Sequence, residues 1–211
     1  MDYSKKYKTE RKEVARFMRR LYSHGLTTTT GGNISLRVAD DIIALTPSGT
    51  DKGSMKCEEV GLLSLNGDNL TPHLKPSIES EVHLSVYRKK DVKAIVHAHP
   101  TFTTAFTAMK NKIDIKLTAE ALIILSEPSF VPYALMGSKK LAELVAESVA
   151  QSDILLLENH GVLTTGSNLL QAFDKIEVLE NAARMTLIVE FVGKKKSLST
   201  EKIREIAKLF K

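Results

Sequence analysis

Two histidines stand one residue apart in the stretch KAIVHAHPT, at positions 93–101. Side chains at positions i and i+2 of a β-strand project from the same face, so His97 and His99 can reach one point in space if the strand ends at a cleft. Pro100 favours a strand end, because it cannot donate a hydrogen bond to a neighbouring strand. The pair fits half of a metal site, and it equally fits two surface or hydrogen-bonded core histidines.

A third histidine lies in the stretch ENHGVLTTG, where His160 follows an apolar strand and precedes Gly161. The alternative is a turn without chemistry, because Asn and Gly favour such turns in any case. Three histidines at two strand ends match a catalytic zinc site, which takes three protein ligands and keeps one position open. The single cysteine, Cys57, excludes a thiolate cluster, so nitrogen and oxygen atoms must hold any metal.

A carboxylate is available in the stretch KPSIESE, which contains Glu79 and Glu81. Glu79 is predicted near a helix N-terminus beside Ser77, where backbone N–H groups attract anions, so it fits either a helix cap or a base. The stretches GGNIS at 31–35 and TPSG at 46–49 are turns that can hold a phosphate through backbone amides. Each of these signals is nonspecific when taken singly.

The elements that must position these residues belong to one α/β domain. Apolar residues at helical spacing predict a first helix around positions 14–22. Short apolar runs predict strands at 33–38, 41–48, 60–65, 92–99 and 153–159. Further helices are predicted over 75–90, 101–109, 138–151, 168–191 and 199–210. The expected fold is a single domain over residues 1–211, with a mixed, largely antiparallel central sheet flanked by helices.

Composition narrows the class of protein. The chain has 43% hydrophobic and 26% charged residues and no apolar run long enough to span a membrane. The charged start MDYSKKYKTERKEV does not resemble a secretory signal, which predicts a cytoplasmic protein. The net charge of +5 comes largely from short lysine runs without interleaved aromatic residues, which argues against nucleic-acid binding. A mild positive charge suits an anionic small substrate.

The ordered set GGNIS, TPSG, KPSIESEVH, HAHP and ENHG, spread over residues 31–161, resembles the class II aldolase and ribulose-phosphate 4-epimerase family. The resemblance implies that Zn²⁺ is held by three histidines and that Glu79 is the catalytic acid/base, which can also ligate the metal. The implied zinc histidines are His97, His99 and His160. The implied contacts to the sugar phosphate are Gly32, Asn33, Ser48, Gly49, Ser77 and Ile78. The sequence departs from the family at Ile78, which replaces a serine and removes one hydroxyl contact to phosphate.

The activity that the resemblance implies is reversible cleavage of a ketose 1-phosphate, such as L-fuculose 1-phosphate, to dihydroxyacetone phosphate and lactaldehyde. The epimerase branch typically has aspartate at the position of Glu79, so the glutamate favours an aldolase. Related aldolases use a tyrosine of a neighbouring subunit as a second acid, but none occurs between His99 and Leu125. Tyr133 is the predicted substitute, although a buried structural tyrosine is the commoner role. The resemblance also implies a fourfold symmetric homotetramer with active sites between subunits.

Two other functions fit the same motifs. The methylthioribulose-1-phosphate dehydratase branch is similar in its histidines and glutamate, and it eliminates water instead of cleaving a carbon–carbon bond. An adducin-like scaffold on this fold would bind no metal, and the three histidines argue against it. The choice among zinc, manganese and cobalt also stays open, because all three accept imidazole and carboxylate ligands.

Overall fold

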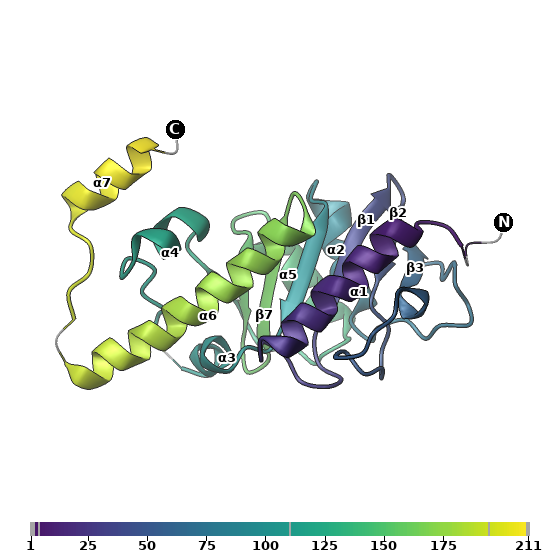
Figure 1. The fold of residues 1–211 in the computed structure, drawn as a ribbon, viewed down its shortest axis with the longest axis horizontal. Coiled ribbons are helices and arrows are strands. Elements are labelled where there is room, and N and C mark those ends of the chain that lie inside the picture. Colours follow the sequence, from purple (N-terminus) through teal and green to yellow (C-terminus); the bar gives the residue numbers. More distant parts are fainter. Residues whose placement is uncertain (1–2, 4, 110, 194, 210–211) are drawn as a thin grey trace.

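A seven-stranded sheet forms the centre of the protein, in the order β3-β2-β1-β4-β7-β6-β5 (Figure 1). The computed structural model describes residues 3, 5–109, 111–193 and 195–209. The strands are β1 (Asn33–Ala39), β2 (Ile42–Leu45), β3 (Gly61–Ser64), β4 (Ala94–Ala98), β5 (Ser129–Val131), β6 (Ile154–Leu157) and β7 (Gly161–Gly166). Neighbouring strands pair antiparallel, except that β5 and β6 run parallel. The prediction of a mixed, largely antiparallel sheet is therefore confirmed.

Helices cover both faces of the sheet, so the fold has three layers (Figure 1). On the near face lie α1 (Lys8–Ser23), α3 (Thr101–Thr107) and α6 (Leu169–Val192), and on the far face lie α2 (Ser80–Lys89) and α5 (Lys139–Ser148). Side chains of one strand alternate between the two layers. In β6, for example, Ile154 and Leu156 pack in the core under α1 and α6, whereas Leu155 and Leu157 pack in the core under α2 and α5.

The remaining helices are short. They are the 3₁₀ turn η1 (Cys57–Glu59), α4 (Ala119–Ile124) and α7 (Thr200–Leu209), the last of which contacts α4. The long helix α6 begins where the Asn168 side chain accepts a hydrogen bond from the Gln171 amide, and it ends at Gly193 in the left-handed region. Within the part of the chain that the structure describes, none of the helices has the length and apolar content needed to cross a bilayer.

The predicted elements are present, with bounds that differ, and four further elements, η1, α4, β5 and β7, were not predicted. The predicted last helix ran to Phe210, which lies outside the described residues. The short helix α4 and the edge strand β5 have no strong periodic signal, and β7 was interpreted only as the turn after His160. β7 lies between β4 and β6 in the sheet, so it brings the two histidine-bearing strand ends together.

Candidate active site

His97 is the most deeply buried of the three histidines, with 2% of its surface exposed. It lies in β4 next to Ile95 of the core under α2, and alternation along the strand directs its ring to that same face. Its Nδ1 lies 3.0 Å from the carbonyl oxygen of Val162, which can only accept a hydrogen bond. Nδ1 therefore carries a proton and donates it to Val162, and Nε2 is the ring atom that faces His99 and Glu79.

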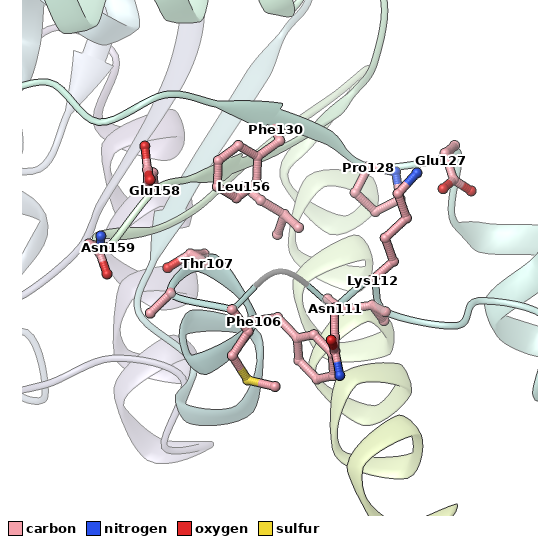
Figure 2. Close-up of a pocket in the computed structure, with 13 residues that line it drawn as sticks. Phe106, Thr107, Asn111, Lys112, Glu127, Pro128, Phe130, Leu156, Glu158 and Asn159 are labelled. Atoms are coloured by element: carbon pink, nitrogen blue, oxygen red, sulfur yellow. The ribbon is translucent and has the colours of Figure 1, made fainter. Parts of the chain in front are cut away.

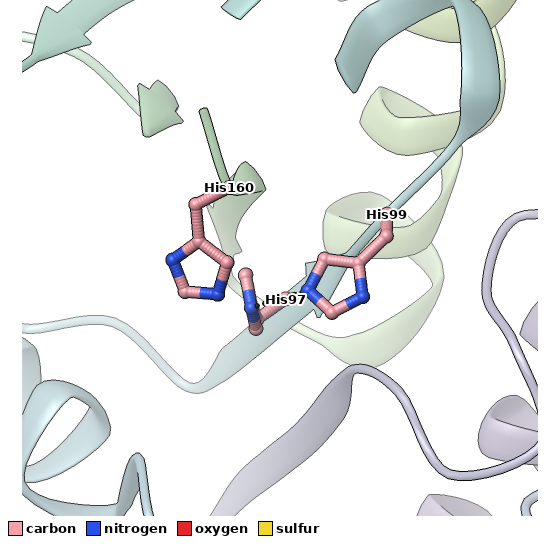
Figure 3. Close-up of side chains that lie close together, drawn as sticks. All are labelled: His97, His99 and His160. Carbon is pink, nitrogen blue, oxygen red and sulfur yellow. Dashed lines mark hydrogen bonds between the residues drawn. The ribbon is translucent and has the colours of Figure 1, made fainter. Parts of the chain in front are cut away.

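The other two histidines meet His97 from outside its strand (Figure 3). β4 ends at Ala98, so His99 lies one residue beyond the strand rather than within it, as predicted over 92–99. The Nε2 atoms of His97 and His99 are nevertheless 3.1 Å apart. His160 lies on the turn between β6 and β7, and one nitrogen from each of the three rings falls within 4.8 Å of the others.

A glycine makes this approach possible. A Cβ atom at Gly161 would lie 2.5 Å from the carbonyl oxygen of Ala98 and 2.5 Å from Cδ2 of His99. Real Cβ contacts are never that short, so only glycine lets the start of β7 pass beside His99. The Asn-His-Gly sequence therefore does not merely favour a turn, because the packing of the histidine cluster requires its glycine.

Glu79 faces the histidines. It is the residue before the first turn of α2, yet its side chain makes no capping hydrogen bond to that helix. One carboxylate oxygen lies 3.3 Å from Nε2 of His97, and the other lies 3.3 Å from Nε2 of His160. The oxygen nearest His97, Oε2, also accepts a hydrogen bond of 2.7 Å from the side-chain nitrogen Nδ2 of Asn33. The alternative role of Glu79 as a helix cap is therefore wrong.

The charges in this cluster favour an ionised carboxylate and neutral rings at His99 and His160. Burial lowers the pKa of His97, but the charge and hydrogen bond of Glu79 outweigh burial and raise it, so that His97 shares a proton with the carboxylate. Burial raises the pKa of Glu79, but the charge and hydrogen bond of His97 and the hydrogen bond of Asn33 outweigh burial and hold that pKa well below its usual value. Burial lowers the pKa of His99 to about 3 and that of His160 to about 4, and the neighbouring His97 lowers both further. Neutral imidazole and ionised carboxylate are the forms that bind a metal.

The donor set fits a divalent metal ion. Zinc–nitrogen bonds of about 2.0–2.1 Å place two ligands of a tetrahedral site about 3.3 Å apart, close to the separations of 3.1 and 3.3 Å seen here. The hydrogen bond from His97 to a backbone carbonyl is also the usual way in which proteins orient a metal-binding histidine. His97, His99, His160 and Glu79 are thus the residues that could hold the ion.

A cavity of about 310 Å³ opens beside the cluster. Five of the six predicted substrate contacts line it, namely Gly32, Asn33, Ser48, Ser77 and Ile78. Gly49 is not among the lining residues, although it adjoins Ser48 in the chain. Glu79, His99 and His160 line the same cavity, so the predicted phosphate turns and the predicted metal ligands meet in one place.

Sequence reasoning missed one charged residue of this cavity. Lys52 lines the cavity and is 1% exposed, and its ammonium donates a hydrogen bond of 2.6 Å to the carbonyl oxygen of Pro47. Burial lowers the pKa of Lys52 to about 8, against an opposing effect of the Glu59 charge. The stretch TPSGTDKG contains little that marks this lysine, because a lysine in a polar turn is usually solvated.

Tyr133 lies apart from the cluster. Its side chain is 61% exposed, so the alternative of a buried structural tyrosine is wrong, and it does not line the cavity, although Met136 of the same segment does. Its backbone N–H donates a hydrogen bond of 2.7 Å to the carboxylate of Glu158. Within one chain, the structure does not bring Tyr133 together with Glu79 and the histidines.

A second, larger cavity of about 500 Å³ adjoins the first at Asn159, which lines both (Figure 2). Its walls come from the end of α3, the segment after it, β5 and the end of β6, and they include Phe106, Phe130 and Leu156. Asn159 has a φ of 52°, in the left-handed region that asparagine tolerates better than most residues. The turn that carries His160 therefore separates two cavities.

Comparison with known proteins gives the same family that the motifs indicate. Residues 12–187 match the family described as class II aldolase and adducin N-terminal domain. An L-fuculose phosphate aldolase of Methanocaldococcus jannaschii is 36% identical, over 88% of this chain and 99% of its own. A 5-deoxy-D-ribulose 1-phosphate aldolase of Bacillus thuringiensis is 31% identical, over 95% of each chain. A 3-oxo-tetronate 4-phosphate decarboxylase of Haemophilus influenzae is 36% identical, over 79% of this chain and 81% of its own.

A solved structure of an L-fuculose 1-phosphate aldolase superposes with a TM-score of 0.84, at 28% identity and with 95% of each chain covered. Sequence and fold thus agree over nearly the full length of the chain. Class II aldolases depend on a metal ion, and the three histidines form a group that could bind one. The chain belongs to the class II aldolase and adducin family, and membership of this family implies a lyase.

Proposed function

We propose that this protein is a zinc-dependent aldolase that cleaves a ketose 1-phosphate, such as L-fuculose 1-phosphate, reversibly to dihydroxyacetone phosphate and lactaldehyde. The observation that carries the proposal is the position of Glu79, whose two carboxylate oxygens each lie 3.3 Å from a histidine of the cluster, at the wall of a cavity with phosphate-type turns. The aldolase relatives support the substrate class. When bound, zinc would stabilise as a Lewis acid the negative charge that develops on the substrate's carbonyl oxygen.

Glu79 is proposed to move the proton at the reacting carbon. In the direction of synthesis, its carboxylate takes a proton from C3 of dihydroxyacetone phosphate, and the electron pair of that C–H bond forms the enediolate. C3 then bonds to the aldehyde carbon, and the new alkoxide takes a proton from a second acid. In cleavage, the same steps run in reverse, and Glu79 returns its proton to C3. The low pKa of Glu79 keeps its carboxylate ionised in the free enzyme, which is the form that can accept a proton.

Tyr133 is proposed as the second acid, acting from a neighbouring subunit. Its exposed side chain, which does not line the cavity of its own chain, supports a role at a subunit interface. Exposed apolar residues near it, Phe130, Leu135 and Met136, support the same proposal. We propose a fourfold symmetric homotetramer in the cytoplasm, and light scattering after gel filtration measures its mass.

The phosphate group is proposed to lie against the turns that contain Ser48 and Ser77, with Gly32, Gly49 and the backbone amide of Ile78 nearby. Lys52 is proposed to supply the positive charge, since its buried ammonium lines this cavity. A buried charge that meets a phosphate dianion forms a stronger hydrogen bond than a hydroxyl does. Lys52 would thereby offset the hydroxyl that Ile78 lacks.

A second candidate reaction is decarboxylation of a 3-oxo-tetronate 4-phosphate, which the 36% identical relative from Haemophilus influenzae favours. Loss of carbon dioxide next to the carbonyl leaves the same enediolate, so the metal and Glu79 would act alike. Both reactions yield dihydroxyacetone phosphate. They differ in the other product, which is an aldehyde in one case and carbon dioxide in the other.

The test is a panel of substrates with analysis of both products. We expect L-fuculose 1-phosphate or a related deoxyketose 1-phosphate to give dihydroxyacetone phosphate and an aldehyde, in a reaction that chelator abolishes and zinc restores. Carbon dioxide from 3-oxo-tetronate 4-phosphate would establish the decarboxylase instead. Turnover of methylthioribulose 1-phosphate or epimerisation of a pentulose phosphate, without dihydroxyacetone phosphate, would establish another branch of the family.

Variants then assign the roles. Glu79→Gln keeps the size of the side chain but cannot take up the proton, so we expect a loss of turnover of at least about 100-fold with metal still bound. A fully active Glu79→Gln enzyme would refute the role of this residue. Tyr133→Phe should lower turnover while leaving the tetramer intact. Elemental analysis of protein prepared without chelator should find about one metal ion per chain, and its absence would support a metal-free scaffold.

A further inference from the structure

A chain of buried polar side chains runs inward from Glu79, away from the cavity. Asn33 Nδ2 lies 2.7 Å from Glu79 Oε2, and Asn33 Oδ1 contacts Nε2 of His83 on the next turn of α2. Nδ1 of His83 lies 2.6 Å from the hydroxyl of Ser35, which is 2.9 Å from the hydroxyl of Tyr87. All four residues behind Glu79 are at most 4% exposed, so they lie within the core between β1 and α2.

The hydrogen bonds of this chain have only one consistent direction. A carboxylate only accepts, so Asn33 must turn its NH₂ group toward Glu79 and its carbonyl oxygen toward His83. That carbonyl also only accepts, so Nε2 of His83 must carry a proton. Burial and the charge of His97 lower the pKa of His83 to about 3, so the ring is neutral and Nδ1 is an acceptor.

The direction of the hydrogen bonds at Ser35 and Tyr87, the end farthest from Glu79, follows in the same way. The hydroxyl of Ser35 must donate to Nδ1 of His83, which leaves its oxygen to accept from Tyr87. The alternative acceptor for Tyr87, the carbonyl oxygen of Lys93, lies at 3.5 Å and is the weaker partner. Four donors in succession thus point toward the carboxylate of Glu79.

We propose that His83 is a positioning residue of the active site, which fixes the amide of Asn33 so that its NH₂ group holds the Glu79 carboxylate toward the histidine cluster. The role of Glu79 as proton acceptor rests on the function proposed above, whereas the orientation of Asn33 does not. If the amide of Asn33 turned over, its oxygen would face the carboxylate, and the two acceptors would repel each other. His83 opposes this rotation, because its Nε2 would have to lose its proton before it could accept from the turned amide, and the hydrogen bonds from Ser35 and Tyr87 would then have to reverse.

The burial of this chain supports a functional role. Tyr87 packs with aliphatic side chains of α2, β2 and β4, and His83 is buried on the same helix, where apolar residues of similar size would pack without any need for hydrogen-bond partners. A polar chain in such a place specifies one arrangement of its members. Glu79 lies at the end of this series of hydrogen bonds that faces the cavity, so the series fixes the position of the Glu79 carboxylate.

Two substitutions of His83 test whether the hydrogen-bond donor at Nε2, rather than the ring as a whole, is needed. The side-chain nitrogen of glutamine can take the place of Nε2, whereas that of asparagine reaches only to the place of Nδ1. We expect His83→Asn to lower kcat by about 10- to 100-fold with little change in KM, as is common for residues that orient catalytic groups. His83→Gln should restore kcat to within about threefold of the native enzyme. Metal content should be native in both.

Ser85→Ala is the matched control on the same helix. The hydroxyl of Ser85 donates to backbone carbonyls of Val82 and Ala142, outside the chain that leads to Glu79. This variant should lose some thermal stability and keep its kcat. If His83→Asn behaves in the same way, with lower stability and native kcat, His83 has only a structural role and the inference is wrong. Equal loss of kcat in His83→Asn and His83→Gln would also overturn it.

A measurement on the native protein tests the inference without substrate. The nitrogen chemical shifts of the His83 ring in the ¹⁵N-labelled protein report which nitrogen carries the proton. We expect a neutral ring protonated at Nε2 across the range of pH in which the protein is folded. A ring protonated at Nδ1, or at both nitrogens near neutral pH, would overturn the inference even if no variant folds. Absence of turnover with every substrate would contradict the proposed function only.

Discussion

Replacement of Lys52 by methionine tests how the phosphate group is held. Methionine has a similar length and fills the same buried space, but it carries no charge. A hydrogen bond to a charged group is worth about 1.5–3 kcal/mol, which corresponds to a change of about 10- to 150-fold in an equilibrium constant. We expect Lys52→Met to raise the inhibition constant of inorganic phosphate and the KM of the sugar phosphate by that factor.

The protein should tolerate this substitution. The pKa of Lys52 is lowered from 10.5 to about 8 because burial disfavours the charged ammonium. Below pH 8, the folded state keeps this charge at a penalty of about 3 kcal/mol that methionine removes, since each pKa unit is worth about 1.4 kcal/mol. The substitution also leaves the carbonyl of Pro47 without its donor, which costs about 1–3 kcal/mol. The two effects are opposed, so we expect the free energy of unfolding to change by less than about 2 kcal/mol.

The pH dependence gives the sign of the effect. As the pH rises through about 8, Lys52 of the free enzyme loses its proton, so its attraction for phosphate is lost. kcat/KM for the sugar phosphate should therefore fall above pH 8 in the native enzyme, and this decline should be absent from Lys52→Met. The matched control is the same sugar without its phosphate, for which the two enzymes should have similar kcat/KM. Inhibition by inorganic phosphate that differs by less than twofold between them would refute the reasoning.

Three further predictions follow from single contacts. Gly161→Ala places a Cβ atom 2.5 Å from the Ala98 carbonyl and from His99. Metal affinity, measured in competition with a chromogenic chelator, should therefore fall by about 10- to 100-fold. A native metal affinity would contradict the tight packing around Gly161. Ile78→Ser supplies the missing hydroxyl and should lower the KM of the sugar phosphate by about 2- to 10-fold, and a higher KM would exclude a phosphate contact there. Asp153 is bound by Lys90, Thr165 and Lys175, and although burial raises its pKa, these contacts outweigh burial and lower it from 3.8 to about 2. The stabilisation from this lowered pKa is present above about pH 4 and is lost as the pH falls toward 2. Because 39% of the side chain is exposed, we expect it to add only about 1 kcal/mol to the free energy of unfolding in urea. Asp153→Asn should remove this pH dependence of the free energy of unfolding.

The sequence predicted those strands whose two faces are both apolar. β4 and β6 lie inside the sheet and bury aliphatic side chains toward both helical layers, so they read as continuous apolar runs. β7 is equally central but was missed, because its sequence GVLTTG contains two threonines and two glycines. Those threonines are buried with partners that sequence cannot show. Thr164 donates to the carbonyl of Ala172, and Thr165 donates to the carboxylate of Asp153.

The cluster of histidines could be predicted because each of its residues lies in a short motif. His97 and His99 are two positions apart, and the motif of His160 includes the glycine that its packing requires. The hydrogen bonds that hold Glu79 from the core side, through Asn33 and His83, could not be predicted in this way. Asn33 and His83 are 50 positions apart, and their contact exists only because β1 and α2 lie face to face. A histidine within an amphipathic helix carries no signal of such a partner.

The cluster of histidines and Glu79 does not by itself separate an aldolase from a decarboxylase or an epimerase. Each of these reactions places charge on a carbonyl oxygen next to the bond that breaks, so each needs the same Lewis acid. The proposed phosphate end of the cavity, at Ser77 and Lys52, would also be common to them, because every candidate substrate carries a phosphate. The difference must therefore arise where the departing fragment lies, and we expect that fragment at the wall that Met136 and Asn159 provide.

That wall is open on the isolated chain. Met136 is 55% exposed, and Tyr133 of the same segment is 61% exposed, whereas Asn159 leads into the second cavity. Residues at the phosphate end, such as Ser77 and Lys52, are buried within one chain. If a neighbouring subunit completes the open wall, dissociation of the oligomer should change the preference among substrates more than it changes the affinity for inorganic phosphate. Substrate panels measured on dilute and concentrated enzyme, with the oligomer followed by light scattering, distinguish this from a wall that one chain completes, for which the preference would not change.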